Sequence, residues 1–207
     1  MVWNDKLKRE IPDGWSAASI ISNPLSTAIK PGVARFDKKT YFATADVDGR
    51  NILEGTLISY DGREGRANMQ PTINSIWFAK MKNSVKQLFL NKEMQELVEN
   101  SILSTGFFGL QVREEAFEYI ASFINSSHFE NRKDILAHGA TQEAVNNDDL
   151  ESFYFVVPDT KTLHVFHDAT QGIHAKISRN IIENRKLIKL RNWLLPLLMN
   201  GQAIVSD

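Results

Sequence analysis

The forty residues that precede the C-terminal tail constrain the fold of this chain more than any other segment. Between residues 160 and 199 the sequence contains one proline, Pro196, and its apolar positions recur at steps of three and four. This spacing is typical of a helix with one apolar side. We therefore expect one long helix, which at about 1.5 Å per residue would extend on the order of 60 Å. Asn200 and Gly201 are suited to end it. A first domain of roughly 150 residues would be too small to cover that length alone.

The apolar side of this helix has a pattern that favours pairing with a second helix. Asparagine at two positions of the seam would cost stability but would fix the register and the number of strands. The alternative is that the apolar stripe drifts, as on a straight helix, onto Ile181, Ile188 and Leu195, which would leave both asparagines in solvent. The candidate helix-pairing residues are Phe166, Ile173, Ile177, Asn180, Asn184, Leu187 and Leu194.

Residues 1–158 have a different character. Short apolar or alternating segments are separated by Gly, Pro, Asn and Asp, a pattern typical of a mixed domain. We expect a helix over residues 113–124, with one apolar face, and strands over residues 41–47, 51–59, 74–81 and 153–157. Asp48-Gly49, between the first two strands, predicts a hairpin turn. The sequence thus predicts an α+β domain over residues 1–158, followed by a long helical region over residues 159–207.

Composition excludes several classes of protein. With 43% hydrophobic and 24% charged residues, the 207-residue chain has the balance of a globular protein rather than a disordered one. It contains no cysteine, which rules out disulfides, thiolate metal sites and cysteine nucleophiles. No apolar run approaches the roughly 18 residues that a membrane span requires, and the N-terminus lacks the pattern of a signal peptide. We expect a cytoplasmic protein.

Charge is divided unevenly within the first domain. The net charge is only -1, yet residues 30–86 carry ten basic and six acidic groups, whereas residues 87–158 carry four and twelve. Lysine and arginine neutralise phosphates, while arginine, asparagine and glutamine read base edges, so the basic part is suited to DNA. Residues 62–70, with the sequence GREGRANMQ, are the best candidate for a recognition loop; the alternative is an ordinary solvated loop. The candidate DNA-binding residues are Arg35, Lys38, Lys39, Arg63, Arg66, Asn68, Gln70, Lys80, Lys82 and Gln142.

Enzymatic functions find little support in the sequence. It contains none of the glycine-rich nucleotide-binding motifs and no nucleophile elbow. His164 and His167 have the spacing of metal ligands on a helix, but a solvated helix face is the favoured interpretation because no third ligand is nearby. Asp46 with Asp48, or Asp148 with Asp149, could hold Mg²⁺ for a nuclease, although a turn and a helix cap explain them more simply. We expect no catalytic residue, no metal and no cofactor.

Four stretches of the chain resemble the DNA-specificity subunits of type I restriction-modification systems. GATQEAVNNDDL at residues 139–150, followed by an apolar strand ending at Pro158, is similar to the end of the target recognition domain in that family. LRNWLLPLLMNGQ at residues 190–202 is similar to the end of its conserved helical region. LKREIPDGW at residues 7–15 and STGFFGL at residues 104–110 resemble further landmarks. The resemblance extends over nearly the whole chain.

The resemblance implies a non-catalytic protein that selects a double-stranded DNA sequence for partner enzymes. Methyltransferase (modification) subunits would bring S-adenosylmethionine, and restriction subunits would cleave. The resemblance implies that a methyltransferase subunit docks on the apolar cluster near the helix end, for which the candidates are Arg191, Trp193, Leu195 and Leu198. Asn192 departs from the aspartate that is common in the family, and VPDTK at residues 157–161 lacks its proline-rich helix start.

Family members usually carry two recognition domains and two helices that pack antiparallel as a spacer. This chain has one of each, so the resemblance implies either a half-subunit that forms a homodimer or the C-terminal half of a longer subunit. The alternative function is a stand-alone dimeric coiled-coil protein that binds DNA or acts as a scaffold without enzyme partners.

Overall fold

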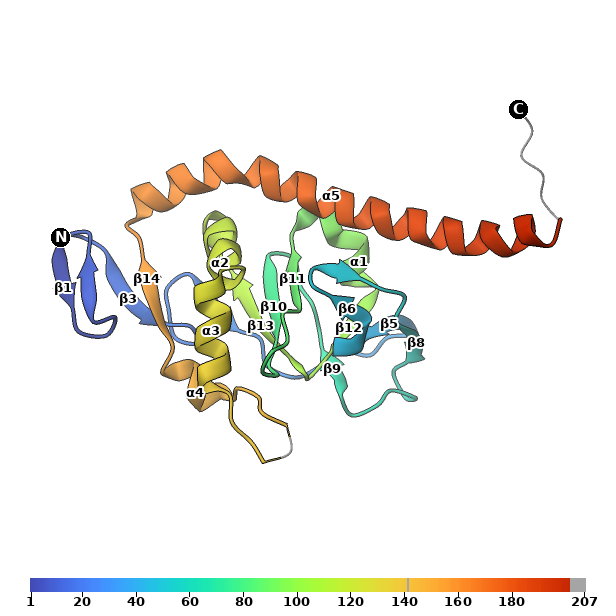
Figure 1. Ribbon diagram of the computed structural model, residues 1–207, viewed down its shortest axis with the longest axis horizontal. Coiled ribbons are helices and arrows are strands. Elements are labelled where there is room, and N and C mark those ends of the chain that lie inside the picture. Colours follow the sequence, from blue (N-terminus) through green and yellow to red (C-terminus); the bar gives the residue numbers. More distant parts are fainter. Residues whose placement is uncertain (141, 202–207) are drawn as a thin grey trace.

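The forty-residue helix expected from the sequence is the longest element of the fold. In the computed structural model, which describes residues 1–140 and 142–201, helix α5 (Thr160–Met199) lies along one side of the other elements (Figure 1). The carboxylate of Asp159 caps its first turn by accepting a hydrogen bond of 2.9 Å from the amide of Thr162. At its end, Gly201 has a φ of +68°, a conformation that glycine adopts without steric cost. The expected helix bounds are confirmed.

Two four-stranded sheets form the centre of the part of the chain that the structure describes. The first has the order β11-β10-β13-β4 and is antiparallel throughout. The second has the order β8-β5-β12-β9, in which β5 and β12 are parallel. The strands of the first sheet are β4 (Ser26–Ala28), β10 (Ser75–Ala79), β11 (Gln87–Leu90) and β13 (Phe107–Val112); those of the second are β5 (Lys38–Phe42), β8 (Thr56–Ser59), β9 (Ala67–Met69) and β12 (Ser101–Ser104).

Shorter antiparallel pairs lie at the periphery. β3 (Ser16–Ser19) pairs with β14 (Tyr154–Val157), which leads directly into α5. β1 (Val2–Asn4) and β2 (Arg9–Ile11) form a hairpin near the N-terminus. β6 (Val47–Asp48) and β7 (Asn51–Ile52) pair around Gly49, whose φ is +57°, so the predicted Asp-Gly hairpin turn is confirmed.

Helices cover the sheets on the sides that face α5 and the N-terminal hairpin (Figure 1). The expected helix over residues 113–124 begins as a 3₁₀ turn, η3 (Glu114–Ala116), and continues as α2 (Phe117–Ile124). Its predicted apolar face is confirmed, because Phe117, Ile120 and Ile124 are all buried in the core. The remaining helical segments are η1 (Thr44–Asp46), η2 (Lys92–Met94), α1 (Gln95–Glu99), α3 (Ser127–Leu136) and α4 (Asn147–Glu151).

Strand β10 explains how the core is divided. Its alternate residues Ile76 and Phe78 pack in one cluster with α2, α3 and β14. Trp77 and Ala79, on the opposite face, pack in a second cluster with residues of β5, α1 and β12. All five residues of β10 are buried, which is why this strand is continuously apolar instead of alternating. Both clusters reach α5: Leu163 belongs to the first, and Ile181 and Ile182 pack against the second.

Two of the expected strands are interrupted within the range that the sequence suggested. The strand expected over residues 41–47 ends at Phe42 and continues as η1, because the Asp46 carboxylate accepts a hydrogen bond of 2.8 Å from the amide of Ala43 and closes a turn. The strand expected over residues 51–59 divides into β7 and β8. Gly55 lies at the break with a φ of +70°, and a Cβ there would stand 2.6 Å from the ring of Phe42. Close packing against that ring therefore bends the chain.

Candidate nucleic-acid interface

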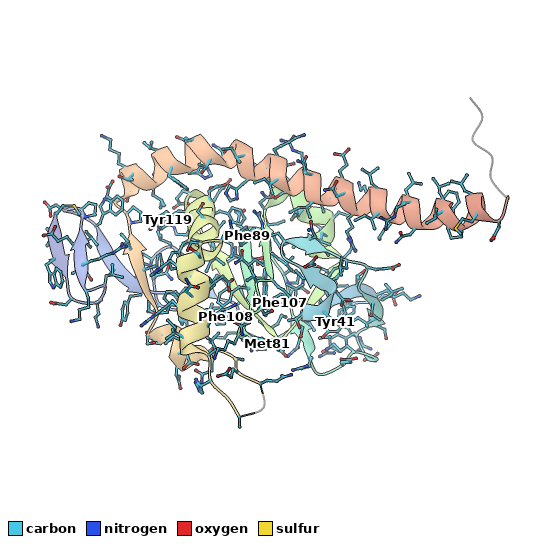
Figure 2. All side chains as sticks on the ribbon, in the orientation of Figure 1. Tyr41, Met81, Phe89, Phe107, Phe108 and Tyr119 are labelled. Carbon is cyan, nitrogen blue, oxygen red and sulfur yellow. The ribbon has the colours of Figure 1, made fainter. Side chains whose placement is uncertain are left out.

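The edge of the domain that faces away from α5 is formed by loops (Figure 1). It contains the segment between β8 and β9, the turn between β12 and β13, and the loop between α3 and α4. Met81 lies on this side as well (Figure 2) and is exposed, while Tyr119 and Phe89 lie towards α5. We call the side away from α5 the loop edge.

Two predicted DNA-binding residues meet at the loop edge. The amide of Lys80 donates a hydrogen bond of 3.0 Å to the carbonyl of Gly106, and the amide of Thr105 donates one of 2.9 Å to the carbonyl of Arg66. Lys80 and Arg66 therefore flank the same β-turn. Burial lowers the pKa of Lys80, and the nearby Arg66 guanidinium lowers it further. Lys82 follows on the same strand end, but its Nζ pairs with the Glu143 carboxylate at 2.9 Å.

A second group of predicted residues surrounds the aromatic rings of Phe36 and Tyr60. The Arg63 guanidinium lies 4.0 Å from the Tyr60 ring centroid, and its Nη1 donates a hydrogen bond of 2.8 Å to the Tyr60 carbonyl. Arg35 pairs with Asp61 at 3.3 Å in an exposed position. Arginine stacked on an aromatic ring in this way remains available to contact phosphate or base edges.

Lys39 and Gln70 are joined across the second sheet. The Nζ of Lys39 donates a hydrogen bond of 3.4 Å to the Oε1 of Gln70. Burial lowers the pKa of Lys39, while the Glu99 carboxylate opposes this effect. Gln70 thus has its amide orientation fixed by a neighbouring cation, and its Nε2 donates to the carbonyl of Pro71 at 3.1 Å.

Lys38 and Lys39 do not lie on one face, although they are adjacent in the sequence. Side chains alternate along β5, so Lys38 is on the same side as Thr40 and Phe42, which line a groove beneath α5. Lys39 is on the opposite side with Tyr41. The pleat of β5 therefore places these two adjacent basic residues on opposite sides of the second sheet.

Arg50 is a further basic residue that the fold removes from the loop edge. Its guanidinium lies 4.4 Å from the centroid of Phe89. Burial lowers the pKa of His174 on α5, and the charge of Arg50 lowers it further, while Glu118 opposes both effects. Burial lowers the pKa of Arg50 itself. Arg50 thus lies half-buried against Phe89, on the side of the domain that faces α5 and not at the loop edge. The last two DNA candidates are placed differently: Asn68 is half-buried in β9, and Gln142 is exposed in the loop between α3 and α4.

Helix α5 is attached to the domain by apolar and polar contacts along its first two thirds. The Nδ1 of His167 lies 2.6 Å from the Glu118 carboxylate of α2. Arg179 approaches Glu93 at 3.8 Å. His167, one of the two histidines considered above as metal ligands, therefore makes a hydrogen-bonding contact with Glu118. Within the described residues no group of three or more His, Asp or Glu side chains is placed to hold a metal ion.

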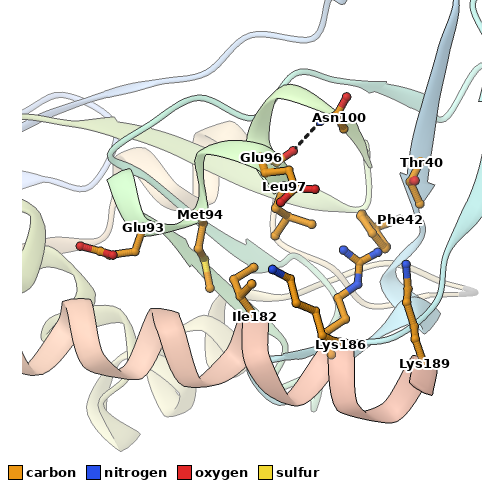
Figure 3. A pocket seen from close by; sticks show the side chains of 11 residues that line it. Thr40, Phe42, Glu93, Met94, Glu96, Leu97, Asn100, Ile182, Lys186 and Lys189 are labelled. Atoms are coloured by element: carbon orange, nitrogen blue, oxygen red, sulfur yellow. Dashed lines mark hydrogen bonds between the residues drawn. The ribbon is translucent and has the colours of Figure 1, made fainter. Parts of the chain in front are cut away.

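Figure 3 shows the groove of about 490 Å³ between α1 and the later part of α5. Arg185, Lys186 and Lys189 reach into it from α5, and Glu96 and Leu97 line the opposite wall. The Arg185 guanidinium lies 5.1 Å from the Phe42 ring centroid, and burial lowers the pKa of Arg185 while Glu96 opposes the effect. Side chains of opposite charge therefore face each other across this groove, beyond Ser178, the last buried residue of α5.

The candidate helix-pairing residues fall into two groups. Ile173 and Leu187 are 58% and 55% exposed, and Asn180 and Asn184 are exposed between them. Phe166, Ile177 and Leu194 are half-buried, and the Phe166 ring stacks edge-on against Tyr119 at 6.1 Å. The alternative apolar stripe, expected for a straight helix, is only partly covered by the domain. Ile181 packs on the domain, whereas Ile188 and Leu195 are exposed. The side of α5 that carries Ile173 and Leu187 is therefore free in the single chain.

The candidate docking residues lie near the end of α5, beyond most of the domain. Trp193 is 64% exposed, and Leu195 and Leu198 are also exposed. Arg191 donates a hydrogen bond of 2.8 Å to the side chain of Asn192, and both residues are exposed. Trp193 lines a shallow hollow with Leu53 of the domain, but is not buried by it. An apolar surface of this kind is unusual in a protein that acts alone.

The two aspartate pairs have structural roles in part. Asp149 and Asn146 form a capping box at the start of α4, with hydrogen bonds of 2.7 and 3.0 Å, so the predicted helix cap is confirmed. Asp46 closes the turn after β5. In residues 1–140 and 142–201, no helix is both long and apolar enough to cross a membrane.

Comparison with known proteins finds similarity to the specificity subunits of type I restriction enzymes. No family model matches the sequence. The chain is 24% identical over 218 residues to the type I restriction enzyme MjaIX specificity subunit of Methanocaldococcus jannaschii, an alignment that covers all of this chain and 48% of that protein. It is 29% identical over 70 residues, 34% of this chain and 15% of the relative, to the HindI specificity subunit of Haemophilus influenzae. The chain thus spans about half the length, or less, of the curated relatives it matches.

Solved structures agree with the sequence comparison. A chain from a study of complex assembly in a type I restriction-modification system matches with a TM-score of 0.63 and 16% identity, over 96% of this chain and 53% of that one. The HsdS subunit from Thermoanaerobacter tengcongensis gives 0.51 at 16% identity over 93% and 49% of the two chains. The S subunit from M. genitalium gives 0.52 at 15% identity over 93% and 48%. These TM-scores show a shared fold, although the sequence identities are low.

Proposed function

From the similarity of this chain to the specificity subunits of type I restriction-modification systems, as a half-length version with one domain and one helix, we infer that it selects the DNA sequence on which such a system acts. The observation that carries this proposal is the alignment with the M. jannaschii specificity subunit along the entire chain. The chain would be non-catalytic and would work in the cytoplasm, with no cofactor of its own. Methyltransferase and restriction subunits would perform the chemistry.

Sequencing of methylated adenines tests this function directly. A host without other methyltransferases would express the chain together with the modification subunit from the same system. A single methylated sequence motif that disappears when the chain is omitted is the expected result. Methylation that is unchanged without the chain would contradict the proposal.

DNA recognition is supported by the polar groups at and beside the loop edge. Arg63 and Gln70 are held in fixed orientations by their neighbours, which is a requirement for reading base edges. Phosphate contacts would come from lysines and arginines, which fix position without carrying sequence information. The full proposed interface contains Arg35, Lys39, Arg63, Arg66, Asn68, Gln70, Lys80, Lys82 and Gln142.

Gln70→Ala is expected to relax the sequence preference at one base pair, at a cost of about 1–3 kcal/mol for the preferred base. A glutamine amide makes two hydrogen bonds to adenine, which alanine cannot replace. Selection of bound duplexes from a randomised pool measures the preference. Gln95→Ala, at an exposed glutamine on α1, is the matched control and should leave the preference unchanged. An unaltered consensus in the Gln70 variant would remove this residue from the interface.

Partner docking is supported by the exposed end of α5. Trp193→Ala is expected to reduce co-purification with the methyltransferase subunit at least tenfold, because a central exposed tryptophan typically dominates such interfaces. DNA affinity of the free chain should change little. Trp3→Ala removes a comparably exposed tryptophan from the N-terminal hairpin and serves as the control. Equal retention of the partner by both variants would place docking elsewhere.

Self-association is supported by the free side of α5. A homodimer, or pairing with the other half of a longer subunit, would cover Ile173 and Leu187. The same stripe also favours the alternative of a stand-alone dimer that binds DNA or acts as a scaffold. Co-purification with a methyltransferase subunit separates the two functions, since only the specificity subunit requires that partner.

A further inference from the structure

Folding brings two cations together at the loop edge without a counter-charge. Lys80 continues from β10, and its carbonyl accepts a hydrogen bond of 3.0 Å from the amide of Val145, so its backbone is fixed on both sides. Arg66 precedes β9, and its carbonyl accepts a hydrogen bond from the amide of Thr105. Thr105 and Gly106 form the turn to which the amide of Lys80 also donates a hydrogen bond. Residues fourteen positions apart in the sequence are thereby held next to each other.

Neither side chain has an anionic partner in the described residues. Among residues 1–140 and 142–201, no hydrogen bond or ion pair joins the Lys80 ammonium or the Arg66 guanidinium to another group, whereas Lys82 is neutralised by Glu143 at 2.9 Å. Repulsion from Arg66 adds to the burial that lowers the pKa of Lys80. Lys80 is half-buried and Arg66 is exposed, and two like charges held close together repel each other unless an anion binds between them.

We infer that Lys80 and Arg66, on either side of the Thr105–Gly106 turn, form a clamp for one phosphodiester group of the DNA backbone. This inference rests on the proposed DNA recognition and changes the role of Arg66. The sequence favoured Arg66 as a reader of a base edge, within a glycine-containing loop. In the fold its guanidinium shares a site with a lysine, which offers a point charge suited to phosphate and no pattern suited to a base.

The backbone of the turn gives the clamp its rigidity. The amide of Gly106 donates a hydrogen bond of 3.1 Å to the Oγ of Ser104, and a Cβ at Gly106 would stand 2.9 Å from the methyl group of Thr44. The turn is thus packed against η1 and cannot widen to separate the cations. A phosphate bound there would fix the register of the domain on the duplex without selecting a base.

The salt dependence of DNA binding tests the clamp. The full chain would be titrated with a 30-base-pair duplex of random sequence by fluorescence anisotropy between about 50 and 200 mM salt, the range over which phosphate contacts dominate affinity. Arg66→Gln and Lys80→Gln should each reduce the slope of log K against log salt by about 1, in magnitude, and the double variant by no more than about 2. Lys92→Gln, at an exposed lysine of η2 outside the proposed interface, is the control and should leave the slope unchanged.

Sequence selection from a randomised pool supplies the second readout. The consensus selected by Arg66→Gln should equal that of the unaltered chain. A changed consensus with an unchanged slope would make Arg66 a base reader and overturn the clamp. Unchanged slopes in both variants would also overturn it while leaving DNA recognition intact. Failure of the unaltered chain to bind any duplex would instead overturn the proposed function, and the clamp with it.

Inorganic phosphate distinguishes a DNA clamp from a site for a free anion. Phosphate at 10 mM, with ionic strength held constant, should compete weakly with the duplex. Full displacement of the duplex at that concentration, lost in Lys80→Gln, would assign the site to free phosphate and overturn the clamp.

Discussion

Ile173→Asp combined with Leu187→Asp is expected to convert the protein from a dimer to a monomer. Both side chains are more than half exposed on the free side of α5. Ile173 lies about two helical turns before Asn180, and Leu187 lies about two turns after it. Carboxylates at both positions would place four charges in the interface of a two-fold dimer, where they would be desolvated without partners. Light scattering at micromolar concentration should give twice the 23.5 kDa chain mass for the unaltered protein and a single chain mass for the variant.

The control for this experiment is Leu57→Asp. Leu57 is 65% exposed on β8, away from the seam, so its replacement should leave the dimer intact. A strictly monomeric unaltered chain would refute self-association. A dimer that survives the double substitution would place the interface on another surface.

Self-association has a consequence for the DNA target. Two identical recognition domains related by a two-fold axis must bind two identical half-sites in inverted orientation. The expected target of a homodimer is therefore a palindrome interrupted by a spacer whose length depends on the helices. If the chain pairs with a different recognition domain in a longer subunit, the target is asymmetric. The methylated motif distinguishes these outcomes, and a non-palindromic motif from a proven homodimer would refute the symmetry argument alone.

Gly109→Ala is expected to lower the free energy of unfolding by about 3 kcal/mol or more. Gly109 pairs with Trp77 across β13 and β10, and the fully buried indole occupies the space where a side chain would be. A Cβ at Gly109 would stand 2.4 Å from the Trp77 ring, a distance that requires the central strand to shift. Chemical denaturation followed by tryptophan fluorescence measures the change.

Glycine-to-alanine substitutions at two other positions are the controls for this stability measurement. Gly172→Ala on α5 meets nothing within 4 Å and should raise stability by up to about 1 kcal/mol, because alanine favours the helix. Gly65→Ala, also in open space, should have an effect within about 0.5 kcal/mol. Equal stability of the Gly109 variant and the unaltered protein would contradict this prediction, because it would show that the sheet can shift to accommodate the added Cβ.

The sequence predicted well those elements that are defined by neighbouring residues. The bounds of α5 follow from an N-terminal cap at Asp159, the lack of a breaker before Pro196, and the stop at Asn200 and Gly201. The hairpin at Gly49 and the buried face of α2 are equally local. Helix α3 was missed, because its buried side includes Lys133, whose ammonium is fully buried and paired with Glu130 at 2.6 Å. The Lys133 ammonium also donates a hydrogen bond of 2.9 Å to the carbonyl of Ser84, so a charged residue occupies a core position and interrupts the apolar periodicity that would indicate a helix.

The sequence alone determined the chemistry of this protein, and the tertiary structure decided where that chemistry lies. An excess of basic residues over 30–86, no catalytic motif and one long helix could all be derived from residue types and spacing. Only the fold separated Lys38 from Lys39, packed Arg50 against Phe89, and brought Lys80 beside Arg66. The physical reason is that strand pleating separates residues that are adjacent in the sequence, and strand pairing brings together residues that are distant in it.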